Sequence, residues 1–321
     1  MPIFAGATLA GFILLVWGAD RFVLGAAATA RNLGVAPVLI GLTIVGFSTS
    51  APEILVSVMS SLQGTPGLAI GNAIGSNIAN IALVLGATAA VMPIDLRSET
   101  LRREMPALLA ITLLSVMLFL DAYLSRVDGF VLLAGLVLLM YWITKLGFRS
   151  TATDPIQAEY EAEIPSGVSM PMAVGWLALG LVVLLLGANL LVWGAESIAR
   201  VLGVSDLIIG LTIVAVGTSL PELAVSIVSA LKNEHGLAIG NIVGSNMFNT
   251  LAVVGVAGVI HPSPFETEVL TLHLPVMIGF TVVLFTMAYD FSGRGRINRV
   301  EGFALVIAFA TYHYYIFSRS L

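Results

Sequence analysis

Two glutamates interrupt stretches of the sequence that are otherwise as apolar as a lipid bilayer, and each follows a proline directly. Glu53 lies in "GFSTSAPEILVS", which begins at Gly46, and Glu222 lies in "AVGTSLPELAVS", which begins at Ala215. A proline breaks the hydrogen bonding of a helix one turn back and frees carbonyl oxygens there. A carboxylate in hydrocarbon is costly unless it has a partner, and these segments offer no Lys, Arg or His at comparable depth. The two breaks therefore predict a buried site for a cation.

Other oxygen-bearing side chains accompany the two glutamates. Hydroxyl groups precede each glutamate by three or four positions, and a serine precedes an asparagine by four positions in both "GNAIGSNIAN" and "GNIVGSNMFN". These residues are Thr49, Ser50, Thr218, Ser219, Ser76, Asn80, Ser245 and Asn249. A donor set made only of oxygens suits Ca²⁺, Na⁺ or Mg²⁺ rather than zinc or copper. Two carboxylates neutralise one Ca²⁺, and a flexible cage of roughly six to eight oxygens favours Ca²⁺ over Mg²⁺.

The composition places these residues in a membrane. Of 321 residues, 58% are hydrophobic and only 10% are charged, and the mean hydropathy is +1.01. So much apolar surface indicates a polytopic membrane protein. The net charge of −5 argues against a nucleic-acid partner. The absence of cysteine excludes disulfides and thiolate chemistry. Because no Lys or Arg precedes the first apolar run, that run is not expected to be a cleavable signal peptide.

Apolar runs of about 20 residues, the length that crosses a bilayer, recur along the chain. We expect an all-α membrane protein of ten transmembrane helices, at residues 3–29, 36–62, 67–92, 106–124, 129–147, 170–199, 205–231, 236–260, 269–289 and 299–317. With ten spans, eleven Lys and Arg residues fall on one side of the membrane and three on the other. The positive-inside rule then predicts that both termini lie outside the cytoplasm. The acidic segment 148–169 becomes a cytoplasmic linker, which we interpret as a solvated hinge.

The sequence also contains an internal repeat. Shifting the chain by 169 residues aligns 18–86 with 187–255 without a gap, with 36 identities in 69 positions. The equivalent elements are five spans apart, an odd number, so the second copy is expected to be inverted relative to the first. The predicted organisation is a five-helix repeat at 1–147 with its signature at 41–86, the linker, and an inverted five-helix repeat at 170–321 with its signature at 210–255. Such an architecture places a substrate site near the midplane of the membrane.

The paired "TSAPE" and "TSLPE" motifs, together with the two asparagine-rich segments, resemble the α-repeats of the calcium:cation antiporter superfamily, in particular its prokaryotic sodium/calcium exchangers. The resemblance covers essentially the whole chain. It implies that the protein is an antiporter and not an enzyme. Such an antiporter has no cofactor and exchanges Na⁺ for Ca²⁺ by alternating access at one central cluster. When the roles of the family's residues are transferred by motif position, the resemblance implies that Glu53 and Glu222 are the shared carboxylate ligands. It likewise implies that the hydroxyl and amide residues named above are oxygen ligands. Gly46 and Ala215 are then expected to contribute carbonyl oxygens.

The sequence departs from that family at two positions. Ser48 stands where the family commonly has glycine, and Asn249 stands where some exchangers have aspartate. Potassium-dependent members tend to have acids at the positions of Asn80 and Asn249, and proton-coupled members have a glutamate in the corresponding region. The lack of these acids argues against both couplings.

Several alternatives remain open from the sequence. A proton-coupled Ca²⁺ antiporter is the nearest, a passive cation channel is a different class, and an intramembrane hydrolase could use the same two glutamates. The resemblance implies Ca²⁺, Na⁺ and the lipid bilayer as partners, no obligate protein partner, and the inner (plasma) membrane as location.

Overall fold

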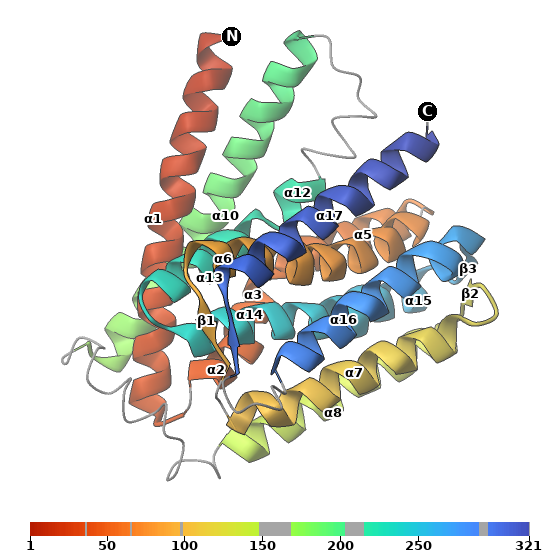
Figure 1. Cartoon of the computed structure of the whole chain (residues 1–321), viewed down its shortest axis with the longest axis horizontal. Coiled ribbons are helices and arrows are strands. Elements are labelled where there is room, and N and C mark those ends of the chain that lie inside the picture. The colour runs from red at the N-terminus through yellow and green to blue at the C-terminus, as the bar shows by residue number, and fades with distance from the viewer. Residues whose placement is uncertain are drawn as a thin grey trace.

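The apolar runs form the helices of this protein, and prolines mark where several of them begin. The computed structural model describes residues 1–35, 37–64, 66–96, 99–147, 168–202, 215–288 and 295–320 (Figure 1). In the labels below, η marks a short π-helical stretch. The helices of the first half are α1 (Pro2–Leu33), α2 (Pro37–Ile40), η1 (Gly41–Val45), α3 (Gly46–Thr49), α4 (Ala51–Leu62), α5 (Pro66–Ala79), η2 (Asn80–Leu85), α6 (Gly86–Val91), α7 (Glu99–Phe119) and α8 (Arg126–Gly147). Those of the second half are α10 (Met170–Val201), α12 (Ala215–Thr218), α13 (Leu220–Leu231), α14 (His235–Phe248), η4 (Asn249–Val253), α15 (Val254–Ile260), η5 (Val269–His273), α16 (Leu274–Ala288) and α17 (Arg299–Ser320).

Several of these helices, alone or joined end to end, are long and apolar enough to cross a membrane. Among the described residues there are seven such helices, or eight if the bent pair Pro37–Thr49 and Ala51–Leu62 forms one span. The segments Glu104–Phe119 and Leu220–Leu231 are shorter apolar helices. Helix covers most of the described part of every expected segment, but α7 begins at Glu99 rather than at 106 and ends before 124. The protein is therefore predominantly helical and membrane-spanning, whereas the count of ten spans stays a prediction. The expected linker 148–169 lies outside the described residues except for Val168 and Ser169.

The repeat seen in the sequence recurs in the helix boundaries. Adding 169 to the bounds of α4 and α5 gives the bounds of α13 and α14. The same shift carries the start of η2, at Asn80, onto the start of η4, at Asn249. These elements form the centre of the molecule. In the most apolar 18-residue stretch of each span, 72% of the residues are buried in Pro66–Val91 and 89% in His235–Ile260, against 22% in α1 and in α10. A helix that is apolar all round and buried on every side belongs in the interior of a bundle.

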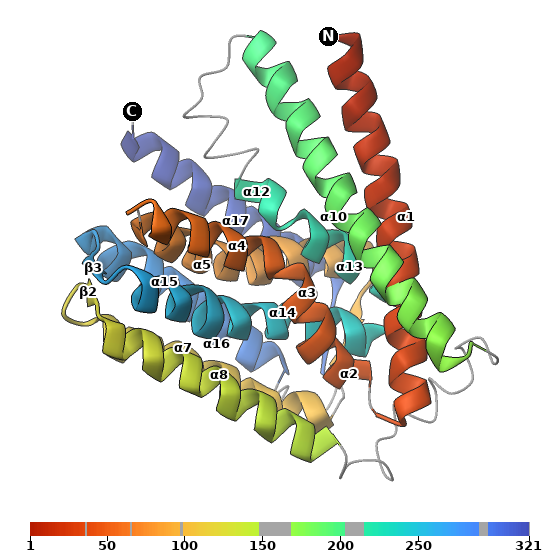
Figure 2. The same cartoon turned by 180° about the vertical axis from the view of Figure 1, so that it is seen from behind.

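The helices α1 and α10 lie side by side (Figures 1 and 2). They pack against each other through glycines, which recur every seven residues on both helices. A Cβ atom placed on Gly18 would lie 2.5 Å from the backbone nitrogen of Leu184, and one placed on Gly187 would lie 2.5 Å from that of Leu15. The glycines of this contact are Gly11, Gly18 and Gly25 on α1 and Gly180, Gly187 and Gly194 on α10. Early residues of α1 meet late residues of α10, so the two helices run antiparallel. Glycine lets membrane helices approach this closely.

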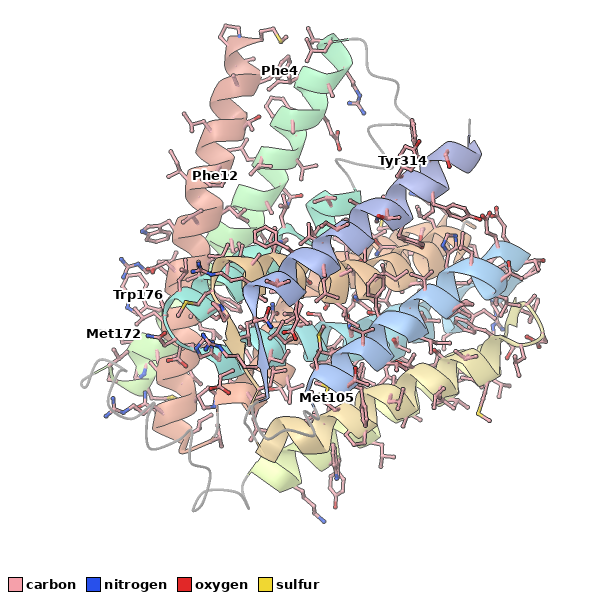
Figure 3. All side chains as sticks on the ribbon, viewed as in Figure 1. Phe4, Phe12, Met105, Met172, Trp176 and Tyr314 are labelled. Atoms are coloured by element: carbon pink, nitrogen blue, oxygen red, sulfur yellow. The ribbon has the colours of Figure 1, made fainter. Side chains whose placement is uncertain are left out.

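Short antiparallel strand pairs tie the helix connections together at opposite ends of the bundle (Figure 1). Strand β1 (Ile94–Asp95) pairs with β4 (Arg296–Ile297), and β2 (Tyr123–Leu124) pairs with β3 (Ser263–Pro264). Apolar side chains cover the outer surface: Phe12 on α1 and Tyr314 on α17 project away from the bundle, whereas Met105 is buried (Figure 3). An apolar exterior of this kind suits contact with lipid.

Candidate cation site

The first proline break separates α3 from α4 and turns the chain inside the bundle. Ser50 leaves the helical conformation, with φ −79° and ψ 1°, and the two helical parts on either side of it are bent by 41°. Pro52 lies in the first turn of α4, where its missing N–H costs nothing, and Glu53 follows in the same turn. The carboxylate therefore lies at a helix N-terminus, where the helix dipole favours negative charge. Glu53 is fully buried.

The second break repeats this geometry 169 residues later. Ser219 adopts φ −90° and ψ 5° between α12 and α13, and Glu222 occupies the first turn of α13 after Pro221. Glu222 is also buried, and Asn241 links the two breaks, because it contacts both the backbone carbonyl of Glu222 and the hydroxyl of Thr49. The structure thus brings together two carboxylates from the two halves of the chain, at the N-termini of two matched helices.

The two asparagines at the site begin the π-helical stretches η2 and η4. Asn80 and Asn249 are both buried, and each marks the point where α5 or α14 changes from α-helical to π-helical hydrogen bonding. Single π turns inside α-helices are uncommon and frequently lie at functional sites. The sequence predicted the asparagines as site residues but did not predict the change of helix type.

Hydrogen bonds connect the first break to α14. The Thr49 hydroxyl donates to Asn241 Oδ1 at 2.9 Å and lies 3.2 Å from the hydroxyl of Ser245. Ser245 also lies 3.4 Å from the carbonyl oxygen of Gly46, which accepts the backbone N–H of Ser50 at 3.1 Å. The Gly46 carbonyl, a predicted ligand, is therefore already a hydrogen-bond acceptor in this arrangement.

Many oxygens of this cluster are buried without a hydrogen-bond partner among the residues that the structure describes. They include both carboxylate oxygens of each glutamate, and the further ones are Ser50 Oγ, Ser219 Oγ, Asn80 Oδ1 and Asn249 Oδ1. Buried polar atoms are normally satisfied, because an unpaired one costs free energy. A cation that accepts lone pairs from these oxygens would satisfy them together. In the described part of the chain, no three His, Cys, Asp or Glu side chains are placed so that they could hold a metal ion together. The unpaired oxygens of this cluster belong to two carboxylates and to neutral hydroxyl and amide groups.

The predicted site residues fall into three groups. Those that are buried in the interior are Thr49, Ser50, Glu53, Ser76, Asn80, Ser219, Glu222, Ser245, Asn249 and Gly46. Thr218 is only partly buried and lines a cleft. Ala215 begins α12, and its side chain lies outside the described residues.

The structure adds polar residues that the sequence analysis did not select. Asn241 contacts Thr49, and Asn246 accepts a hydrogen bond from Asn80 Nδ2 at 3.1 Å. Asn77, the repeat equivalent of Asn246, donates to the hydroxyl of Thr250 at 2.9 Å. All three asparagines are identical between the two copies of the repeat, and that identity is the signal that would have found them.

A cleft of about 250 Å³ reaches the breaks from the side of α10. Its walls are Pro52, Leu185, Ala188, Asn189, Val192, Glu196, Gly217, Thr218 and Pro221. Four of the equivalent residues in the first half are buried: Ala19, Val23, Ala27 and Thr49, which correspond to Ala188, Val192, Glu196 and Thr218. Val16 and Asp20, which correspond to Leu185 and Asn189, are exposed or partly exposed. The two breaks therefore differ at their threonines: Thr218 lines an open cleft, whereas Thr49 is sealed from solvent.

Comparison with known proteins places this arrangement among transporters. The sodium/calcium exchanger protein family matches residues 3–146 and 172–318. The chain is 48% identical to CaxA of Alkalimonas amylolytica over 97% of both chains. It is 37% identical to the inner membrane protein YrbG of Escherichia coli (strain K12), over 89% of this chain and 90% of YrbG. The solved structure of the sodium/calcium exchanger from Methanococcus jannaschii superposes with a TM-score of 0.82 at 33% identity, covering 97% of this chain and 98% of that one.

Proposed function

Because the chain belongs to the sodium/calcium exchanger protein family, we propose that it exchanges Na⁺ for Ca²⁺ at a site built around Glu53 and Glu222. The coarser conclusion, that it is a multi-pass membrane antiporter for cations, follows from the family. The finer assignment is carried by one observation: the two buried carboxylates and several oxygens around them have no hydrogen-bond partner among the residues that the structure describes. The equivalent segments of the two halves meet at this pair.

The chemistry of the cluster fits both ions. One Ca²⁺ neutralises the two carboxylates, and the hydroxyl and amide oxygens around them complete a flexible hard-oxygen shell. Ca²⁺ and Na⁺ have similar radii, so the same oxygens serve either ion in turn. Asn80 and Asn249 offer amide oxygens that bind a cation but cannot exchange a proton, and this favours Na⁺ over H⁺ as the coupled ion.

The proposed architecture is two inverted repeats of five helices, at 1–147 and 170–321, joined by a cytoplasmic linker at 148–169. The matched bounds of α4 and α13 and of α5 and α14 support the repeat. The antiparallel packing of α1 against α10, which occupy equivalent positions in the two halves, supports the inversion. We place the protein in the inner (plasma) membrane with both termini outside the cytoplasm, in line with eleven basic residues on the opposite side.

Alternating access follows from the charge of the site. The loaded site is neutral and passes between states exposed to opposite sides of the membrane, whereas an empty site with two negative charges is too costly to move through a low-dielectric environment. The open cleft beside Thr218 and the sealed equivalent beside Thr49 correspond to one of these two states.

Transport in proteoliposomes tests the proposal. Vesicles loaded with Na⁺ and diluted into Na⁺-free medium with ⁴⁵Ca²⁺ should take up calcium, and replacing K⁺ on both sides with choline should not change the rate. A pH gradient imposed on Na⁺-free vesicles should drive no uptake. Uptake driven by that pH gradient would replace Na⁺ coupling with proton coupling, and calcium flux without any counter-gradient would indicate a channel.

A further inference from the structure

Asn241 joins three helices at the sealed side of the cation site. Its Oδ1 accepts the Thr49 hydroxyl of α3 at 2.9 Å. Its Nδ2 lies 2.9 Å from the Ser226 hydroxyl and 3.2 Å from the carbonyl oxygen of Glu222, both on α13. Asn241 itself is fully buried in α14. One side chain therefore holds the first proline break against the helix that carries the second glutamate.

The repeat mate of Asn241 stands in a different environment. Asn72, on α5, is only partly buried, and its Nδ2 atom has no hydrogen-bond partner among the described residues. If the first half repeated the contacts of the second, Asn72 would be hydrogen-bonded to Ser57, which is the repeat equivalent of Ser226. The Ser57 hydroxyl instead donates to the carbonyl oxygen of Val253, in η4, at 2.6 Å. The same asparagine is thus engaged in one half and disengaged in the other.

This difference coincides with access to the site. Thr49, which Asn241 holds, is sealed from solvent, whereas Thr218, its repeat mate, lines the open cleft. The engaged asparagine is on the closed side and the disengaged one is on the open side. The preceding sequence does not explain the difference, because "GLAIGN" ends at Asn72 in one half and at Asn241 in the other.

We infer that Asn72 and Asn241 are alternating clamps, each of which closes one side of the site and releases it when the other engages. In the opposite state, Asn72 would hold Thr218, Ser57 and the carbonyl of Glu53, while Asn241 would lose its three contacts. The inference rests on the proposed exchange by alternating access. It makes both asparagines positioning residues, since they act on Thr49 and Thr218 rather than on the ion.

The clamp predicts opposite effects for the same substitution in the two halves. Asn241→Leu keeps the size of the side chain but removes three hydrogen bonds from the present state only, and Asn72→Leu removes them from the opposite state only. The ratio of the two states should shift by about a hundredfold, which corresponds to about 3 kcal/mol, in opposite directions.

A cysteine reporter measures this ratio. The chain has no cysteine, and Asn189, exposed in the cleft, provides the position for Asn189→Cys. The labelling rate with a thiol-reactive maleimide is measured in nanodiscs with Ca²⁺ present, where both faces are accessible to the reagent. Asn241→Leu should slow labelling at least several-fold and Asn72→Leu should not slow it. Asn32→Leu, the same change at an exposed position on α1, is the matched control and should leave the rate unchanged.

The test separates the clamp from the proposed function. Equal effects of the two leucine variants, no effect of either, or the reverse order would overturn the clamp. If a leucine variant does not give folded protein, the pair Asn241→Ala and Asn72→Ala removes the same hydrogen bonds without adding bulk and is judged by the same outcomes. Labelling does not depend on which ion drives transport. Normal Na⁺-driven exchange with unresponsive labelling would therefore refute only the clamp, and opposite labelling shifts without Na⁺-driven exchange would refute only the coupling.

Discussion

Lys232 Nζ lies 2.8 Å from Asp20 Oδ1 and 3.0 Å from the backbone carbonyl of the same residue, so the C-terminal end of α13 is bound to the middle of α1. The repeat equivalents of these two residues are Gln63 and Asn189, which carry no charge. The ion pair therefore exists on one side of the molecule only, the sealed side. It is partly exposed, with about a third of each side chain accessible.

The first prediction concerns variants without this ion pair, in which each residue is replaced by the one at the equivalent position of the other repeat. Asp20→Asn and Lys232→Gln should each weaken the attachment of α1 to α13 by up to about 1 kcal/mol, the range of partly exposed ion pairs. Labelling of the Asn189→Cys reporter should fall slightly in each variant, and no further in the double variant. Lys145→Gln removes a lysine that stacks on Tyr141 instead and is the control. Additive effects of the two substitutions would show that the pair does not act as a unit.

The second prediction concerns the carboxylates. Glu53→Gln and Glu222→Gln keep the shape of each side chain but leave one negative charge where the proposed site needs two, so Na⁺-driven Ca²⁺ uptake should fall to background. Glu301→Gln is the control, because Glu301 accepts a hydrogen bond from the Asn298 backbone at the exposed start of α17. Each variant should elute as folded protein in size-exclusion chromatography. Wild-type uptake at equal expression would remove the substituted glutamate from the site.

The third prediction concerns the glycine contact between α1 and α10. Gly18→Ala places a methyl group 2.5 Å from the backbone of Leu184, so the helices must separate, at a cost of about 1–3 kcal/mol. Gly6→Ala is on the same helix but meets no atom within 4 Å. Thermal unfolding in detergent, followed by tryptophan fluorescence, should show a lower melting temperature for Gly18→Ala and no decrease for Gly6→Ala. Equal melting temperatures would mean that the contact contributes nothing to stability.

The fourth prediction tests the orientation. Leu33 and Gln63 are exposed at the ends of α1 and α4, on opposite sides of the proposed topology. In intact cells, an impermeant maleimide should label Gln63→Cys, and it should label Leu33→Cys only after the membrane is permeabilised. Thr153→Cys, in the linker, should behave like Leu33→Cys. The reverse pattern would place the termini in the cytoplasm and leave the fold unchanged.

The features that the sequence predicts correctly are those with local causes. Pro52 and Pro221 each sit where a helix must be interrupted, and the structure turns at Ser50 and Ser219, two residues earlier. The apolar lengths predicted most helix positions, because a run must be long enough to cross the bilayer. The expected bounds of the fourth span, 106–124, were wrong for the helix, because α7 begins in the polar segment at Glu99, runs through Pro106 and ends at Phe119.

The features that the sequence does not predict depend on packing between segments that are distant in the chain. Asn241 becomes a contact of Thr49 only because α14 passes beside α3, 192 residues away in the sequence. The sequence does not predict the difference between Asn72 and Asn241 either, because the same "GLAIGN" ends at both residues and the difference lies in the contacts that surround them. The π-helical stretches at Asn80 and Asn249 likewise have no signal in residue type or spacing.

The glycine contact has a mechanical consequence. Where the backbones of two helices are in direct contact, no side chain lies between them whose rotamer could change to let the helices shift. We therefore expect α1 and α10 to move as one rigid unit, called the arm here. One member of that arm, α1, covers the sealed side, and the other, α10, forms a wall of the open cleft. A tilt of the arm that brings α10 onto the cleft must also lift α1 from the opposite face. We therefore expect that the two entrances are not open at the same time while the contact between α1 and α10 stays intact.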